Sequence, residues 1–357
     1  MVRIAELGAG IISECHFFGL DPRDDVQIVA IASADEAAGR KACEAHPGAR
    51  YYADYRELLM REKGNVDGVI IALPNFMHFE AAKFAIEQGY KYIMCEKPLC
   101  NCSADSKELS RLVEEKGVVF QTAYMKRFNP GFRMIKEKLP ELGKIEFVDC
   151  HIYVSSPDPE SEAAGAIASW HDDAVKSGGG FINHSGSHHF DLLNFIFGDV
   201  ESVRAHVRYV PNTKRDYYMK GNLHTVSGVD IEYHLGRMDV PNLGPDFSVV
   251  RGGWDECIQV IGTNGFIKCE NPTWQGYEAE KVTMWIKGMP GPRTLYVECK
   301  DQWTGELEAF VQAVKAGRLH EDATTCVGGY KVDYLIEKIR ESSEKGGAEV
   351  KIENYNL

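Results

Sequence analysis

Residues 2–13 read Val2-Arg3-Ile4-Ala5-Glu6-Leu7-Gly8-Ala9-Gly10-Ile11-Ile12-Ser13, a short strand candidate that leads directly into a glycine turn and then a helix-like stretch. In this context the first glycine makes the tight turn and the second lets a pyrophosphate approach the backbone. Ser13 replaces the third glycine of the G-x-G-x-x-G pattern and is small enough for close packing. The stretch therefore predicts a nucleotide-binding unit. The residues expected to contact the cofactor here are Gly8, Gly10, Ile11 and Ile12.

Beyond this stretch, apolar runs alternate with amphipathic helical patterns as far as residue 123. Such alternation predicts a mostly parallel sheet covered on both faces, so we expect a Rossmann dinucleotide-binding domain over residues 1–123. The expected strands are Ile28–Ala32, Gly68–Ala72, Tyr92–Cys95 and Val118–Ala123. The expected helices are Glu36–Ala45, Tyr55–Arg61, Phe79–Gln88 and Ala104–Lys116.

The end of the second strand bears on the choice of cofactor. Domains that prefer NAD commonly place a carboxylate there, which hydrogen bonds to the adenosine ribose. Here Ser33 occupies that position and Asp35 follows two places later. Arg40 or Lys41 in the next helix would be needed to reach a 2′-phosphate. We therefore expect NAD, with NADP as the alternative, and Ser33 and Asp35 at the ribose.

The run Tyr92-Ile93-Met94-Cys95-Glu96-Lys97-Pro98-Leu99 ends a strand at a charged pair and a proline. Pro98 restricts Lys97 to an extended backbone, which holds an ammonium group in one place. Open α/β sheets bind their ligands at the carboxyl ends of their strands. Lys97 is therefore a candidate ligand contact, although a solvated turn is the alternative for this tripeptide taken alone.

After Ala123, strand-like segments follow one another with few helices between them. Consecutive strands predict a large, mostly antiparallel open sheet, with one face on helices and the other available to a partner subunit. We expect an α+β domain for substrate binding and oligomerisation over residues 124–357, with the last helix able to pack back on the first domain. Its expected strands are Ile145–Ser155, Val200–Tyr209, Ser227–Leu235, Cys257–Gly262, Gly265–Cys269 and Val282–Ile286. Two helical apolar stripes are expected to be core, at Leu307, Phe310, Val311 and Val314 and at Val332, Leu335, Ile336 and Ile339.

Residues 178–191 read Gly178-Gly179-Gly180-Phe181-Ile182-Asn183-His184-Ser185-Gly186-Ser187-His188-His189-Phe190-Asp191, and a helical pattern continues to about Phe197. His184 and His188 would share one face of a helix that starts this early. Three interpretations are open: a polar helix start with hydrogen-bonded histidines, a metal site with His171 as a further ligand, and a proton-handling active site. No His-Glu-x-x-His motif supports the metal, so we favour the active site.

The composition excludes several classes of protein. The chain has 357 residues, 44% of them hydrophobic, which suits about two domains, and its net charge of −13 disfavours nucleic acid or an anionic membrane as a partner. We find no apolar run long enough to span a bilayer and no signal-peptide pattern. The ten cysteines are scattered, which predicts reduced thiols in a cytoplasmic protein. The spacing of Cys95, Cys100 and Cys102 is not that of a structural zinc site, so no metal is expected.

As a set, these motifs resemble the Gfo/Idh/MocA family of NAD(P)-dependent sugar and cyclitol oxidoreductases, over nearly the whole chain. The motifs that carry the resemblance are Gly8-Ala9-Gly10, Leu73-Pro74-Asn75 with His78, Glu96-Lys97-Pro98, Trp170, the Gly178–Asp191 stretch and a closing helix around Tyr334–Ser343.

The resemblance implies that Lys97 is the catalytic lysine, that a cis peptide bond precedes Pro98, and that His188 contacts the reacting hydroxyl. His184 stands where the family usually has an aspartate that binds substrate, which leaves the proton relay open. Further positions expected at the cofactor are Leu73, Asn75, His78, Glu96, Lys97, Arg127 and Trp170. Positions expected at the substrate are Lys97, Tyr124, Asn183, His184 and His188.

Oxidation of a secondary alcohol transfers a hydride to nicotinamide C4 and a proton to a base. Lys97 can be that base only if its pKa falls from about 10.4 towards neutrality, which burial and positive neighbours can produce. His188 competes, because its unperturbed pKa of about 6.5 needs no such change. We therefore assign Lys97 and His188 jointly to proton transfer, meeting over one nicotinamide ring, with His184 as a catalytic auxiliary.

The resemblance implies a sugar, glycoside or cyclitol as substrate and a role in carbohydrate metabolism. Pro157–Ala168 and Arg237–Gly253 are candidate lids or substrate walls. We expect a homo-oligomer formed through the second domain's sheet, with no nucleic-acid or membrane partner. Two other functions stay open: NAD-assisted glycoside cleavage by transient sugar oxidation, and a non-catalytic nucleotide-binding sensor.

Overall fold

The computed structural model describes residues 1–155, 173–210, 212–238, 254–271, 279–298, 302–353, 355 and 357. The chain divides into two compact units. The first comprises Met1–Met125, Trp303–Asp333 and Leu357, and the second comprises Lys126–Gln302 and Tyr334–Asn356. The predicted division at residue 123 left residues 303–333 in the second domain, and the structure assigns them to the first.

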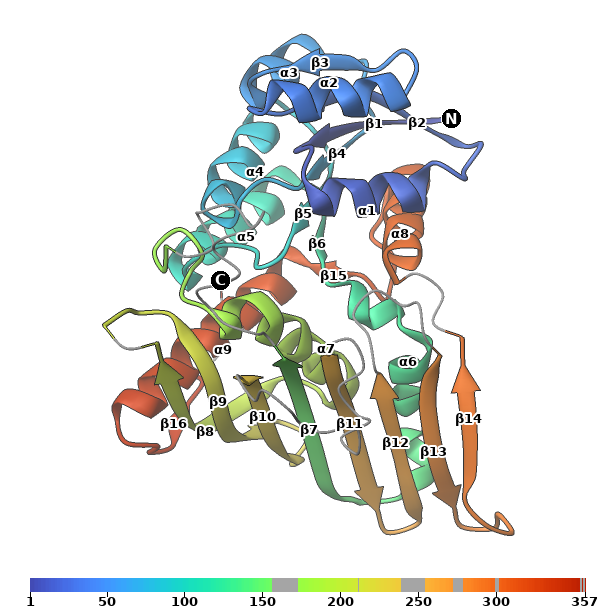
Figure 1. The fold of residues 1–357 in the computed structure, drawn as a ribbon, viewed down its shortest axis with the longest axis vertical. Coiled ribbons are helices and arrows are strands. Elements are labelled where there is room, and N and C mark those ends of the chain that lie inside the picture. The colour runs from blue at the N-terminus through green and yellow to red at the C-terminus, as the bar shows by residue number, and fades with distance from the viewer. Residues whose placement is uncertain are drawn as a thin grey trace. The chain divides into compact units, whose positions relative to one another are not determined.

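The first unit is a doubly wound α/β domain. Its sheet has seven strands among the described residues, in the order β15-β6-β5-β4-β1-β2-β3 (Figure 1). Strands β1 to β6 are parallel and β15 is antiparallel to β6. The strands are β1 (Val2–Leu7), β2 (Val26–Ala32), β3 (Arg50–Tyr52), β4 (Gly68–Ile71), β5 (Tyr92–Glu96), β6 (Val119–Ala123) and β15 (Thr324–Thr325). The helices are α1 (Ile11–Leu20), α2 (Glu36–Ala45), α3 (Tyr55–Arg61), the 3-10 turn η1 (Asn75–Met77), α4 (His78–Glu87), α5 (Ser103–Lys116), α8 (Gln302–Ala316) and the first part of α9 (Cys326–Glu344).

The strand order 3-2-1-4-5-6 is that of a Rossmann domain, so the predicted fold is confirmed. Every predicted helix and strand of residues 1–123 is present, with ends that differ by at most two residues. Only β3 was missed, because a three-residue strand is too short to show an alternating pattern.

Residues 303–333 join the first unit through apolar and hydrogen-bonded contacts. A Cβ at Gly19 would lie 2.7 Å from Leu307, and one at Gly68 would lie 3.1 Å from the ring of Phe310. These two glycines therefore leave the room that the apolar stripe of α8 occupies. Gln121 of β6 donates to the Glu306 carbonyl oxygen at 3.1 Å. The sequence showed the stripe but not the surface that it covers.

The second unit is built on a nine-stranded sheet in the order β14-β13-β12-β11-β7-β10-β9-β8-β16, as counted over the described residues (Figure 1). Its strands are antiparallel neighbours except for β7 and β10, which are parallel. They are β7 (Ile145–Ser155), β8 (Val200–Tyr209), β9 (Asp216–Thr225), β10 (Asp230–Met238), β11 (Trp254–Gly262), β12 (Gly265–Asn271), β13 (Glu280–Ile286), β14 (Arg293–Val297) and β16 (Val350–Lys351). The helical segments are η2 (Met125–Phe128), α6 (Pro130–Lys138), η3 (Leu139–Leu142), the π-helical turn η6 (Ile182–Gly186), α7 (Ser187–Phe197) and the second part of α9.

The large antiparallel sheet was predicted correctly, with errors in single strands. The short strands β14 and β16 were not predicted. The predicted strand Ser227–Leu235 begins only at Asp230, because Thr225 and Val229 close a turn by a backbone hydrogen bond of 3.0 Å. Strand β9 was missed, since its polar residues hide the alternation.

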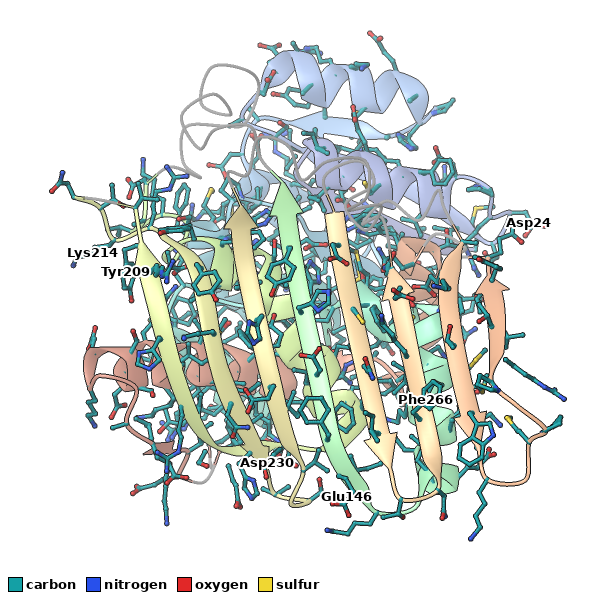
Figure 2. The ribbon with its side chains drawn as sticks, turned by 60° about the horizontal axis from the view of Figure 1, so that its bottom comes forward. Asp24, Glu146, Tyr209, Lys214, Asp230 and Phe266 are labelled. Atoms are coloured by element: carbon teal, nitrogen blue, oxygen red, sulfur yellow. The ribbon has the colours of Figure 1, made fainter. Side chains whose placement is uncertain are left out.

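The two faces of this sheet differ in what covers them. Val148, Cys150 and Ile152 of β7 are fully buried, whereas their neighbour Phe147 is 42% exposed. Figure 2 looks onto the more exposed face of the sheet, where none of the described helices lies across the strands. The sheet is therefore open on one side, as predicted.

Within the described residues, no helix combines the length and the hydropathy needed to cross a lipid bilayer. Every described cysteine is a free thiol.

A charged cluster lies in the core of the second unit, between the sheet and its helices. Lys126 Nζ donates to Glu256 Oε2 at 2.6 Å, and His189 Nε2 hydrogen bonds to Glu256 Oε1. Asn271 donates to Glu256 at 3.4 Å, and the Cys150 thiol lies 3.3 Å from His189 Nδ1. Burial acts to raise the pKa of Glu256, but Lys126 and His189 outweigh it and lower this pKa to about 2. Glu256 is therefore an ionised carboxylate shared by three elements.

Replacing Glu256 by Ala should destabilise the second unit strongly, because it removes the carboxylate to which the buried Lys126 ammonium donates. Loss of one partner of a buried ion pair costs about 3–5 kcal/mol. The measurement is the free energy of unfolding in urea. Glu141→Ala is the matched control, since it breaks the surface pair Lys138–Glu141 (2.7 Å) and should cost less than about 1 kcal/mol. Equal losses in the two variants would contradict this role of Glu256.

Candidate active site

The glycine turn after β1 has the shape that a pyrophosphate needs. Gly8 has φ +134°, and a Cβ there would lie 2.4 Å from the Ala72 carbonyl oxygen, so no larger residue fits. At Gly10, a Cβ would have no neighbour within 4 Å. Gly10 is also the N-cap of α1 and supplies no capping side chain, so the first N–H groups of α1 lack acceptors within the helix. This open turn, with Ile11 62% exposed and Ile12 half-buried, fits the predicted dinucleotide.

The residues expected at the ribose lie at the end of β2. The Ser33 carbonyl oxygen accepts a hydrogen bond from the Tyr51 hydroxyl at 2.9 Å. Asp35 caps α2, because its carboxylate accepts from the Ala38 N–H at 3.0 Å. Arg40 pairs with Glu36 at 2.7 Å and lies over the Tyr51 ring. Asp35 is therefore occupied by its own helix.

Three contacts fix the backbone on either side of Lys97. Glu96 Oε2 accepts the Lys97 N–H at 3.1 Å. The Lys97–Pro98 peptide bond is cis, as the resemblance implied, and the Pro98 carbonyl oxygen lies 2.9 Å from His78 Nδ1. The N–H of Cys100 donates to Asp333 of α9 at 2.9 Å. We call residues 96–100 the lysine turn. Lys97 is half-buried within it, at the carboxyl end of β5.

A second group behind the lysine turn was not predicted from the sequence. His16 Nδ1 lies 2.9 Å from Glu6 Oε1, and His16 Nε2 lies 3.3 Å from Glu96 Oε1. Glu6 and His16 are fully buried and Glu96 is 7% exposed. Burial acts to lower the pKa of His16, but Glu6 and Glu96 outweigh it and raise this pKa to about 10. The signal in the sequence was a glutamate inside the otherwise mostly apolar strand of residues 2–7.

His78 is another residue expected at the cofactor. Its side chain is fully buried, and its two ring nitrogens lie within 2.9 Å of the Pro98 and Leu73 carbonyl oxygens. Burial lowers the pKa of this imidazole. These contacts link the end of β4 to the lysine turn and support it. Leu73 takes part through its carbonyl oxygen, and Asn75 is buried in η1.

In the second unit, the glycine–histidine stretch is anchored by Asp216 of β9. Asp216 Oδ1 accepts the Ile182 N–H at 2.7 Å, and Asp216 Oδ2 accepts from Arg340 at 2.8 Å. The same Arg340 donates to Asn183 Oδ1 at 2.7 Å. At Gly180, a Cβ would lie 2.2 Å from the Asp216 carbonyl oxygen, so this glycine allows the close approach. Asn183, expected at the substrate, is held by Arg340 and is 3% exposed.

The two predicted site histidines lie in successive helical segments, the π-helical turn η6 and the helix α7. His184 lies within η6 and is exposed, whereas His188 lies in the first turn of α7 and is 8% exposed. The next residue, His189, is fully buried on Glu256. Single π-turns within helices are frequent at functional sites.

The remaining site residues divide between the two units. Arg127 forms a two-pronged ion pair with Asp191 of α7, at 2.6 and 2.7 Å, within the second unit. Tyr124 is buried in the first unit, and its N–H donates to the Thr122 carbonyl oxygen at 3.0 Å. Trp170 and His171, and the candidate lids Pro157–Ala168 and 239–253, lie outside the described residues. Among the residues that are described, no group of His, Cys, Asp and Glu could hold a metal ion.

Two sequence models of one family match this chain in succession. The model for an oxidoreductase family with an NAD-binding Rossmann fold matches residues 2–124, and that for the Gfo/Idh/MocA C-terminal domain matches residues 133–268. The chain belongs to the Gfo/Idh/MocA family. It is an oxidoreductase of that family, and its first unit is the NAD-binding domain.

Members of this family with known activities are distant relatives of the chain. Myo-inositol 2-dehydrogenase of Thermotoga maritima is 26% identical over 324 residues, which cover 88% of this chain and 89% of that one. Levoglucosan dehydrogenase of Pseudarthrobacter phenanthrenivorans is 27% identical over 216 residues, or 57% and 53% of the two chains. A solved levoglucosan dehydrogenase, in complex with NADH and levoglucosan, has a TM-score of 0.83 at 19% identity and covers 98% of this chain and 99% of its own. This last similarity supports the fold.

The buried His16 should make the stability of this family member depend on pH. A histidine whose folded pKa is raised contributes its full stability below the unfolded pKa of about 6.5 and loses it as pH rises through the folded pKa. For His16 the loss should therefore extend from about 6.5 to about 10. We expect the melting temperature of the wild type to exceed that of His16→Gln most at pH 6.5, and by steadily less towards pH 9.5. A difference that stays constant or widens with pH would contradict this expectation.

Proposed function

We propose that the chain is an NAD(P)-dependent dehydrogenase that moves a hydride between nicotinamide and a secondary hydroxyl of a sugar, glycoside or cyclitol. The observation that carries the proposal is the lysine turn: an amine at the carboxyl end of a strand in an NAD-binding domain, with its backbone fixed on both sides. Ligands of such domains bind at these strand ends. The activities of the named relatives supply the substrate class.

The chain's own residues handle the proton in this proposal. When bound, the dinucleotide supplies the acceptor for the hydride that leaves the alcohol carbon. The hydroxyl proton passes to the Lys97 amine as the C–O bond becomes a carbonyl, and His188 hydrogen bonds to the same oxygen. A correctly placed base of this kind contributes about 10²–10⁴-fold to the rate. His184, which is exposed, acts as an auxiliary at the substrate.

We propose NAD as the preferred cofactor, with NADP possible. The side chain of Asp35 is engaged as the cap of α2, and Arg40 is paired with Glu36. Neither a ribose-binding carboxylate at position 33 nor an arginine directly after it is present. The preference is therefore expected to be modest.

A direct test is turnover of a substrate panel by the purified full-length chain. The panel holds myo-inositol, levoglucosan, free hexoses and aryl glycosides, each with NAD⁺ or NADP⁺, and absorbance is followed at about 340 nm, where reduced nicotinamide absorbs. Net reduction with a polyol or sugar supports the dehydrogenase. Release of the aryl group without net reduction would replace it with transient-oxidation glycoside cleavage. Cofactor binding without any turnover would leave a non-catalytic binding protein.

Lys97→Met should remove most turnover and leave cofactor binding nearly unchanged. The side chain keeps its length but loses the amine, so we expect kcat to fall by about 10²–10⁴-fold. The dissociation constant of the dinucleotide, measured by fluorescence titration, should change less than threefold. Lys63→Met is the matched control, since Lys63 is an exposed lysine of the same unit. Near-normal turnover of Lys97→Met would rule out the lysine as base.

We also propose that the chain forms a homo-oligomer through the open face of the second unit's sheet. Phe147 and Ile261 are register neighbours on β7 and β11 and are 42% and 38% exposed on this face. Beside them, His151 stacks on Tyr153 with ring centroids 4.9 Å apart. Apolar and aromatic residues gathered on a face are typical of subunit interfaces.

Phe147→Glu together with Ile261→Glu should weaken the oligomer, because two carboxylates would then be buried next to each other at the interface. The mass in solution, measured by sedimentation, should fall towards that of one chain. Phe18→Glu is the control, since Phe18 is 69% exposed on α1 in the first unit. An unchanged mass of the double variant, or a monomeric wild type, would contradict the proposal.

A further inference from the structure

The group Glu6–His16–Glu96 lies entirely inside the first unit. Glu96 begins the lysine turn, but Glu6 and His16 have no part in the proton transfer described above. One imidazole joins two carboxylates from two strands, β1 and β5. His16 comes from the second turn of α1, the helix whose N-terminus faces the glycine turn. The three side chains therefore tie together the elements on which the nucleotide site is built.

Stability alone is a weak reason for such a group. Taking charges out of water is costly, and well-packed apolar residues of similar volume are often as stabilising as a buried ion pair. The segments that carry Glu6 and His16 also supply apolar core residues, among them Ile4, Leu7 and Phe17. A specific role for the charges is therefore worth testing.

The position of Glu96 suggests the role. One carboxylate oxygen lies on His16 Nε2, and the other accepts the N–H of Lys97, the next residue in the chain. His16 therefore fixes the rotamer of Glu96, and Glu96 in turn fixes the backbone from which the lysine side chain extends. These two hydrogen bonds hold the Glu96 carboxylate in this orientation.

The charges act on the same amine. Burial acts to raise the pKa of Glu96, but His16 and Lys97 outweigh it and lower this pKa. A carboxylate beside an amine favours the ammonium form, whereas a base must lose its proton. The imidazolium on the far side of Glu96 offsets that carboxylate. Among the described residues, the charged or titratable groups around His16 are Glu6 on β1, Cys95 and Glu96 on β5, Lys97 in the turn and His78 on α4.

We propose that His16 is a positioning residue for Lys97, which orients Glu96 against the lysine turn and offsets its negative charge so that the amine can release its proton. This inference rests on the proposed role of Lys97 as base. Glu6 completes the arrangement in two ways. Its carboxylate holds the other ring nitrogen of His16, and its negative charge weakens the effect of the imidazolium on Glu96.

The arrangement predicts shifts of opposite sign from two isosteric substitutions. His16→Gln removes a positive charge, so Lys97 should hold its proton more tightly and titrate at higher pH. Glu6→Gln removes a negative charge, so Lys97 should titrate at lower pH. Each shift should be about one pH unit, the effect of a unit charge about 10 Å away at an effective dielectric constant of about 20. Mere loosening of the fold would not give opposite signs.

The experiment measures the titration of Lys97 directly in the full-length protein without added nucleotide. Lysine is labelled with ¹³C next to the amine, and the Lys97 signal is identified by its loss in Lys97→Met. The control is His46→Gln, which removes another histidine of the same unit that lies 3.0 Å from a carboxylate, Asp21, at the surface, and should move the midpoint by less than about 0.2 pH units. With a substrate from the panel, kcat/KM of His16→Gln at pH 7 should fall about tenfold, as the free-amine fraction does.

Midpoints that shift in opposite directions support the inference. Unchanged midpoints in both variants, or shifts of the same sign, would overturn it. If His16→Gln did not fold, the downward shift in Glu6→Gln alone would decide, because its amide still accepts from the imidazole. The two proposals fail separately: turnover retained by Lys97→Met overturns the proposed function, whereas absent shifts with turnover lost in Lys97→Met overturn only the inference.

Discussion

The carboxylate of Glu96 is the contact on which the candidate site depends. It lies between the His16 imidazole and the backbone N–H of Lys97, so the last residue of β5 is tied to α1 and to the turn that follows it. His78 and Asp333 hold the next residues of the same turn through the Pro98 carbonyl oxygen and the Cys100 N–H. A reactive amine is useful only if its position is fixed before the substrate arrives. Here its backbone is fixed by groups of its own unit.

The second unit uses the same device. Glu256 is buried and ionised, and it holds Lys126 of η2 and His189 of α7. His189 follows His188 directly, so the carboxylate fixes the first turn of the helix that carries the predicted site histidine. Asp216 does the same for the residues before it, through Ile182 and Arg340. In both units a buried carboxylate therefore supports a functional segment, and a change at either carboxylate removes an ionic partner of a buried cation.

The sequence predicted most of the fold because each half has one dominant period. Alternating apolar strands and amphipathic helices in residues 1–123 permit little besides a doubly wound sheet, and the observed strand order is that of a Rossmann domain. The placement of α8 was missed, since an apolar stripe shows that a helix is buried but not against what. For the site, residue type and spacing pointed to the motif residues, but not to His16, Asp216, Arg340 and Glu256. Their contacts join residues up to 157 positions apart, which no local pattern can show.

The site residues that were missed share a physical property. It explains why the sequence did not reveal them and why they matter to the fold. Each is charged or titratable, and each has its partner on another strand or helix, which a local sequence pattern does not show. Burying such a group without its partner costs several kcal/mol, so the pairing must be complete in the folded chain. That requirement makes the elements around Glu96 and Glu256 assemble in one arrangement only. The positions of Lys97 and of the first turn of α7 are then set by the charged groups buried in the two cores. They do not depend on bound substrate.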